Sequence, residues 1–168
     1  MLFHSNQENN PPETWADLKA ARSGDTRAFG RLVAPHQEII YSLSYRVLGD
    51  EQIAVEAAQT GVSRAAQNFA KFGSEHFQLW LLHWVVAACQ ERLPNVAPAQ
   101  AAETETGKTN STAGIQSSLC GLPFSLRLTL ILVDVIGLDY SEAATVLRVP
   151  RERVGQWLAQ ARARLMSL

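Results

Sequence analysis

The chain has 168 residues and a formal net charge of −1, and 46% of its residues are apolar. This length holds one domain or two small ones, and this apolar content is ample for folded cores. Because phosphate contacts dominate the affinity of proteins for DNA, a strong DNA binder is expected to be more basic. The charge is uneven: residues 1–93 hold eight basic and ten acidic residues, whereas residues 119–168 hold six arginines and four acids. The composition therefore argues against a protein that binds DNA strongly by itself.

The N-terminal segment, residues 1–13, is polar and lacks the basic-then-apolar pattern of a signal peptide. We therefore expect a disordered N-terminus and a cytoplasmic protein. The apolar run from Leu79 to Cys89 is too short to span a bilayer. Cys89 and Cys120 lack a Cys-x-x-Cys spacing, so buried free thiols are favoured over a disulfide.

A first domain is expected over residues 14–93. Gly24 can end one helix, and Asp25 can cap the next. No stretch shows sustained alternation between turn signals, so no sheet is predicted. The periodicity predicts helices at roughly 14–23, 26–34, 36–48, 51–70 and 75–92.

The predicted helix at 51–70 has two distinct faces. Its core stripe consists of Ala54, Ala58, Val62, Ala65 and Phe69, and its polar face carries Glu56, Gln59, Thr60, Ser63 and Gln67. An ordinary solvated face is one interpretation of this polar side, and a binding surface is the other.

The predicted helix at 75–92 is apolar on nearly every side. Phe77, Leu81, Trp84 and Ala88 form the expected core stripe, and Leu79, Leu82 and Val86 lie nearly opposite. A helix that is apolar all round is normally buried, and an exposed patch of this kind often marks a partner surface. Burial or self-association through the second face is therefore expected, with DNA contact as the alternative.

Residues 94–114 are small, polar and aperiodic. Such a composition cannot bury enough surface to offset chain entropy, so a flexible linker is predicted there. A second domain with about four helices should follow over residues 115–168.

A helix-turn-helix is predicted near the C-terminus. Asp139 can cap a short helix with Glu142 at its third position, and Pro150 suits the start of the next helix. In that second helix Val154, Leu158, Ala161 and Leu165 share the packed face, and Arg153, Gln156, Gln160 and Arg164 share the other. The polar face is either simply solvated or able to read guanine and adenine edges in a major groove.

Motifs in both domains resemble those of bacterial sigma factors of the extracytoplasmic-function type. In the second domain the matching landmarks are Leu122, Pro123, Gly137, Leu138, Tyr140, Glu142, Ala144, Val149, Pro150, Val154, Leu158, Ala161 and Arg162. In the first domain they include Gly24, Asp25, Tyr41, Arg46, Gln59, Phe72, Phe77 and Trp80. The resemblance covers about residues 15–93 and 115–166, in the family's order. It implies an all-α fold of two small helical domains joined by a flexible linker, the second containing a helix-turn-helix.

The resemblance also implies three functional surfaces. Core RNA polymerase would bind the polar face of the helix at 51–70, through Glu56, Gln59, Thr60 and Ser63. A flipped promoter base would enter a pocket in the loop that follows, near Phe72, Ser74, Glu75 and His76. A plain loop in which Ser74 caps the next helix is the alternative. Promoter DNA would be read by Arg151, Arg153, Gln156, Gln160 and Arg164.

Several positions depart from the family's pattern. The acid that usually follows Gln59 is Thr60, and the slots of Gly155, Gln156, Trp157 and Gln160 lack the usual basic residues. The expected function is a sigma factor that directs polymerase to promoters, with an anti-sigma factor as a further partner. The alternative is a diverged sigma-like regulator that acts through protein contacts. No metal spacing, phosphate loop or nucleophile motif occurs, so neither catalysis nor a cofactor is predicted.

Overall fold

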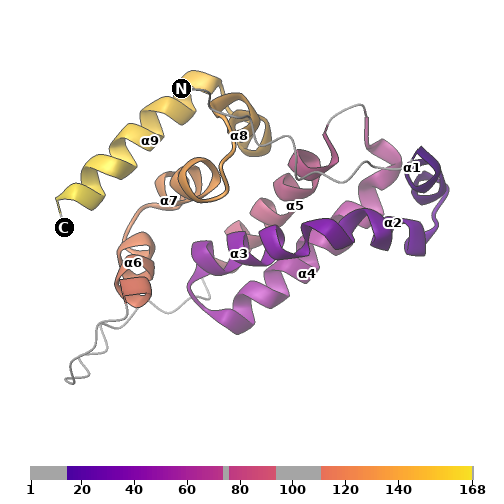
Figure 1. The fold of residues 1–168 in the computed structure, drawn as a ribbon, viewed down its shortest axis with the longest axis horizontal. Helices are drawn as coiled ribbons and strands as arrows, with labels where there is room; N and C mark the ends of the chain where they lie inside the picture. The colour runs from indigo at the N-terminus through magenta and orange to yellow at the C-terminus, as the bar shows by residue number, and fades with distance from the viewer. Residues whose placement is uncertain (1–14, 74–75, 94–110, 168) are drawn as a thin grey trace.

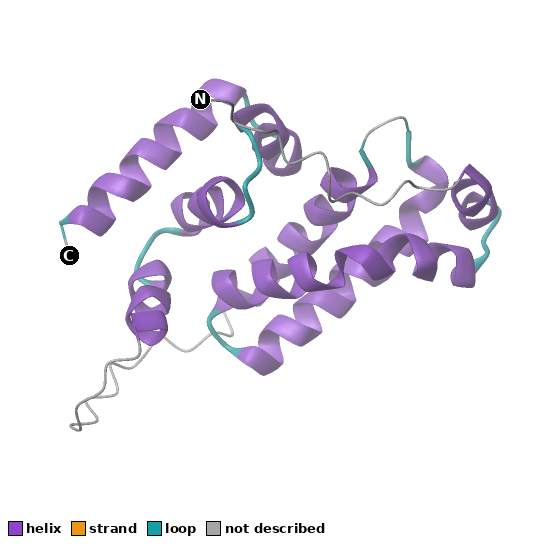
Figure 2. Ribbon diagram, viewed as in Figure 1, coloured by secondary structure: helices purple, strands orange, loops and turns teal. Residues whose placement is uncertain are grey.

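The computed structural model describes residues 15–73, 76–93 and 111–167, and every regular element in these ranges is helical (Figures 1 and 2). The prediction of an all-α fold is confirmed. The elements are α1 (Trp15–Arg22), α2 (Thr26–Val33), α3 (Gln37–Leu48), α4 (Glu51–Asn68), α5 (Phe77–Arg92), α6 (Ser111–Cys120), α7 (Phe124–Leu130), α8 (Tyr140–Leu147) and α9 (Arg151–Met166). Single turns η2 (Ala34–His36), η3 (Phe69–Lys71) and η5 (Ile131–Val135) extend α2, α4 and α7.

The five helices predicted in the first domain agree with α1–α5 to within two residues at each end. The expected disordered segment at 1–13 and most of the expected linker lie outside the described residues. The linker was predicted to extend to residue 114, but α6 already begins at Ser111. Gln116 on α6 bonds to α3, and this long-range contact supports the early start of α6, which its small, polar sequence did not predict.

The first domain is built on the antiparallel packing of α4 and α5, with α3 beside both (Figure 1). Asp50 starts α4 because its side chain accepts a hydrogen bond from the amide of Ile53 at 2.9 Å. Gly61 lets α5 approach closely, since a Cβ at this position would lie only 2.6 Å from Cα of Val85. An aromatic cluster packs where α2, η3 and the start of α5 meet. Edge-on and stacked contacts join its rings, which are those of Phe29, Phe69, Phe72, Phe77 and Trp80.

The second domain contains α6–α9. The predicted cap of α8 is present as a full capping box: Asp139 accepts from the amide of Glu142 at 2.8 Å, and Glu142 accepts from the amide of Asp139 at 2.8 Å. Arg148 ends α8 in the left-handed conformation, with φ 54°, and Pro150 precedes α9. Three residues thus connect α8 to α9, and the two helices pack against each other.

The two domains lie against each other, and one buried apolar cluster spans both of them. Helix α5 packs on α8, and α3 contacts α6, α7 and η5. Residues of both domains, including Leu82, Val86, Leu132 and Val146, belong to a single buried cluster. Figure 1 shows α6–α9 as one group beside α1–α5, with α8 next to the end of α5.

The apolar outer face of α5 is therefore covered by the chain's own second domain. Leu79, Leu82 and Val86 are only 8%, 0% and 7% exposed. The expectation of burial is met, but self-association through this face is not supported, because these side chains are not at the surface. Both cysteines are free, with Cys89 buried and Cys120 half-buried.

Candidate nucleic-acid and polymerase surfaces

The outer side of α9 is the surface predicted to read DNA. Val154, Leu158 and Ala161 are at most 1% exposed and fix the helix on α7 and α8. The five predicted DNA-binding side chains of this helix are all exposed: Arg151, Arg153, Gln156, Gln160 and Arg164. The packing of α9 thus turns the predicted stripe of arginines and glutamines toward solvent.

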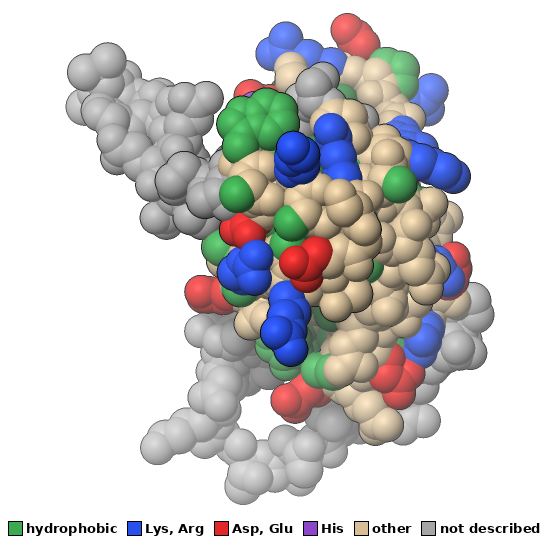
Figure 3. Space-filling view, turned by 90° about the vertical axis from the view of Figure 1, so that its right-hand side faces the viewer, with side chains coloured by type: hydrophobic (Ala, Val, Ile, Leu, Met, Phe, Trp, Pro, Cys, Tyr) green, Lys and Arg blue, Asp and Glu red, His purple; other side chains and the backbone are tan. Residues whose placement is uncertain are grey.

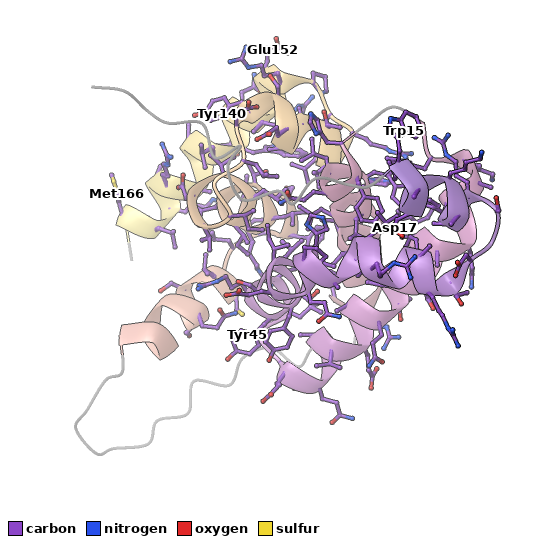
Figure 4. All side chains as sticks on the ribbon, turned by 45° about the vertical axis from the view of Figure 1, so that its right-hand side comes forward. Trp15, Asp17, Tyr45, Tyr140, Glu152 and Met166 are labelled. Carbon is purple, nitrogen blue, oxygen red and sulfur yellow. The ribbon has the colours of Figure 1, made fainter. Side chains whose placement is uncertain are left out.

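Local contacts organise the first half of α9. The guanidinium of Arg153 lies 5.9 Å from the ring centre of Trp157, a cation–π arrangement. Gly155 faces Tyr140 of α8, because a Cβ at Gly155 would lie 3.7 Å from Cε2 of that ring. Figure 4 shows Tyr140 and Glu152 at the same end of the second domain, near the turn between α8 and α9. The contact between Tyr140 and Gly155 therefore packs the start of α8 against the first half of α9.

Arg162, further along α9, has a structural partner. Its guanidinium donates two hydrogen bonds to the carboxylate of Asp134, at 2.6 and 3.0 Å. The ion pair ties α9 to η5 and engages one of the basic groups near the predicted DNA-binding stripe. Sequence reasoning did not find this pair, because the partners lie 28 residues apart without a shared helix.

The polar face of α4 is the surface predicted to bind polymerase. Gln59 and Ser63 are exposed and Thr60 is half-buried. Glu56 forms an ion pair with Arg92 of α5, and Arg92 also donates to Oγ1 of Thr60 at 3.3 Å. Two of the four predicted docking residues therefore also fasten α4 to α5.

A second ion pair joins the same two helices. Arg64 of α4 donates to both carboxylate oxygens of Glu91 of α5, each at 2.7 Å. This hydrogen bonding holds the pKa of Glu91 below its usual range. Two ion pairs thus join the polar face of α4 to α5, and helical periodicity alone did not predict them.

The loop between α4 and α5 contains the remaining predicted DNA contacts. Phe72 is 5% exposed and stacks on Phe69, with ring centres 5.2 Å apart, so it packs in the core and presents no face to a base. Its carbonyl accepts a 2.7 Å hydrogen bond from Arg22 of α1. His76 is exposed and precedes α5 without a side-chain capping bond, whereas residues 74 and 75 lie outside the described residues.

The end of the molecule near α1 and α2 shows no single sign of charge. Figure 3 shows Lys and Arg side chains interspersed with Asp and Glu over this face. Asp17 and Arg31 form one such opposite-charge pair, at 2.6 Å. Among the described residues, no three His, Cys, Asp or Glu side chains group as a metal site. No helix in the same ranges has the length and apolarity needed to cross a membrane.

Comparison with known proteins gives the family that the chain resembles. Residues 32–95 match the family Sigma-70 region 2. Over 165 residues the chain is 29% identical to the extracytoplasmic-function (ECF) RNA polymerase sigma factor SigM of Mycobacterium tuberculosis, covering 91% of this chain and 83% of SigM. It is 24% identical to the ECF RNA polymerase sigma factor SigW of Bacillus subtilis, covering 79% of this chain and 84% of SigW.

Solved structures show the same fold. The chain superposes on CnrH, solved in complex with the cytosolic domain of CnrY, with a TM-score of 0.73 and 25% identity, covering 90% of this chain and 94% of CnrH. The sigma factor RpoE of Bartonella quintana, solved with the anti-sigma factor NepR, gives a TM-score of 0.65 at 15% identity. The match covers 84% of this chain and 96% of RpoE. The region 2 match and the fold are those of sigma factors. The likeness to SigM and SigW across both domains supports the extracytoplasmic-function type, which confirms the resemblance found in the sequence.

Proposed function

We propose that this protein is a stoichiometric specificity subunit that directs RNA polymerase to promoters in the cytoplasm. Core polymerase binds the polar face of α4, and α8 with α9 forms a helix-turn-helix that reads promoter DNA. The observation that carries the proposal is the exposure of both predicted polar faces on a fold similar to CnrH over 90% of the chain. The proposal assigns no catalytic step and no cofactor to the chain.

Each residue has a distinct role in this proposal. Gln156 and Gln160 read base edges, since their amides can pair with adenine. Arg151, Arg153 and Arg164 contact phosphates and set the register of α9 on the duplex. Glu56, Gln59, Thr60 and Ser63 form the docking face. In the loop before α5, the exposed His76 contacts single-stranded promoter DNA in this proposal, and Ser74 and Glu75 are further proposed contacts.

The docking face can be tested with variants that account for the ion pair of Glu56. Glu56→Gln with Gln59→Ala removes the acid and the amide from the face, and we expect weaker capture of core polymerase. Arg92→Gln breaks the same ion pair and leaves both docking side chains in place, so it serves as the matched control. If the double variant, Arg92→Gln and the unaltered chain all bind core polymerase equally, α4 is not the docking helix.

A second candidate function is a sigma-like regulator that binds polymerase without opening promoters. The burial of the outer face of α5 favours it, because in the family this helix follows the single-stranded DNA. An anti-sigma factor is the further proposed partner, since CnrH and RpoE were solved with CnrY and NepR. This second function predicts polymerase binding without transcription from any promoter.

A further inference from the structure

We infer that Arg92 of α5 sets the affinity of the proposed docking face, because it is the internal counter-ion of Glu56 and a basic group of core polymerase must replace it there. Docking is then the exchange of one ion pair for another. The inference rests on the proposed function, since it names the chemistry of the partner group that meets Glu56 on α4. It follows from the contacts that Arg92 makes with α4.

Arg92 holds two residues of the docking face at once. Its Nη1 donates to Oε2 of Glu56, and its Nη2 donates to Oγ1 of Thr60 at 3.3 Å. The hydroxyl of Thr60 in turn donates to the backbone carbonyl of Glu56 at 2.8 Å. A guanidinium presents its donors in a fixed fork, so one arginine can hold both groups together. The acid and one hydroxyl of the docking face are therefore already engaged by the chain itself.

Glu56 nevertheless stays within reach of a partner. Its side chain is 47% exposed, and that of Arg92 is 31% exposed. Arg92 bonds to Oε2, and within the described part of the chain the other carboxylate oxygen, Oε1, accepts no hydrogen bond. Gln59, one turn further along α4, is also exposed. A basic side chain of a partner can therefore approach Glu56 from solvent and compete with Arg92 for its carboxylate.

The packing of α4 on α5 does not depend on this ion pair. The close approach at Gly61 and the two 2.7 Å hydrogen bonds from Arg64 to Glu91 already join the two helices. Ion pairs between exposed side chains contribute little to stability, because water and salt screen them. Loss of the pair between Arg92 and Glu56 should therefore change the charge offered to a partner and leave the helices in place.

The charges on this side of the two helices cancel. Glu56 and Glu91 carry the negative charges, and Arg64 and Arg92 carry the positive ones. The pKa of Glu91 is held below its usual range chiefly by its hydrogen bond from Arg64, and the charge of Arg92 contributes to the same effect. Arg92 thus lies near a second carboxylate. When a partner takes Glu56, Arg92 still has an opposite charge beside it.

Loss of the charge on Arg92 should strengthen docking. In Arg92→Gln, Glu56 has no internal counter-ion, so a basic group of polymerase can pair with it without displacing one. Because ion pairs between exposed side chains are weak, we expect core polymerase to bind about 2- to 5-fold more tightly. The gain should shrink as the salt concentration rises. Arg92→Lys keeps a positive charge beside Glu56 and should bind like the unaltered chain.

The experiment measures the dissociation constant of the full-length chain for core polymerase. Arg92→Gln is tested alone and together with Glu56→Gln. The gain should disappear when Glu56 is already neutral, because Arg92 acts through that carboxylate. Arg64→Gln is the matched control, since it breaks the other ion pair between α4 and α5 and changes the net charge by the same amount. It should give no gain.

Three results would overturn the inference. They are no gain in Arg92→Gln, an equal gain in Arg64→Gln, and an undiminished gain when Glu56→Gln is also present. Failure of the proposed function would look different. In that case the unaltered chain would not capture core polymerase, or Glu56→Gln with Gln59→Ala would bind it as tightly as the unaltered chain does.

Discussion

Two helical glycines should respond in opposite ways to the same substitution. At Gly61 a methyl group would lie 2.6 Å from Cα and 3.0 Å from the backbone nitrogen of Val85, so α4 and α5 must move apart. Overpacking of this kind costs about 1–3 kcal/mol, and contact with rigid backbone favours the upper part of that range. Replacing a helical glycine by alanine returns about 1 kcal/mol. Gly61→Ala should therefore destabilise the protein by about 1–2 kcal/mol.

Gly155→Ala is the matched comparison. The added methyl group would lie 3.7 Å from the ring of Tyr140, an ordinary contact distance, so the helix-forming gain of about 1 kcal/mol is kept. Urea unfolding followed by circular dichroism of the helices measures both variants. The midpoint should fall for Gly61→Ala and rise for Gly155→Ala. A Gly61→Ala protein as stable as the parent chain would refute the close approach of α4 and α5.

Four further predictions concern thiols, DNA and the domain interface. Burial raises the pKa of the Cys89 thiol to about 11. A thiol reagent at neutral pH should therefore label the half-buried Cys120 first and Cys89 only on unfolding. Equal labelling rates of the two cysteines would contradict this prediction. In promoter binding by the polymerase complex, Gln156→Ala should relax preference at one base pair by about 1–3 kcal/mol. Arg164→Ala should weaken binding to all sequences alike and lower the salt slope by about one, and a sequence-dependent loss would remove it from the phosphate contacts. His83→Ala removes one hydrogen bond between α5 and α8, so amide hydrogen exchange at this contact should become about 2- to 10-fold faster. Unchanged exchange would show that this hydrogen bond does not hold α8 on α5.

The helices of both domains could be predicted from sequence because their signals are local. Asp139 and Glu142 stand three residues apart, so their capping box was visible in the chain and is present in the structure. The packed face of α9 follows from the spacing of Val154, Leu158 and Ala161, all of which are buried. Local periodicity thus fixed both the ends of these helices and the side that faces the core.

Contacts between distant segments could not be predicted in this way. The start of α6 was missed because its support comes from α3, through Gln116 and carbonyls 70 and 71 residues away. The apolar outer face of α5 was recognised, but its sequence carries no information on whether α8 or a second copy covers it. Phe72 was considered as a stacking group because aromatic rings serve in both cores and base pockets, and only its contact with Phe69 places it in the core.

The most direct test of the proposed function is a transcription assay. Core RNA polymerase is reconstituted with this chain and supplied with a pool of promoter fragments. The proposed function predicts transcripts that appear only with the chain present, start downstream of a shared promoter sequence, and change that preference when Gln156 is replaced by Ala. Stable capture of core polymerase with no transcript from any fragment would contradict promoter direction, and the protein-binding regulator would then be the correct description.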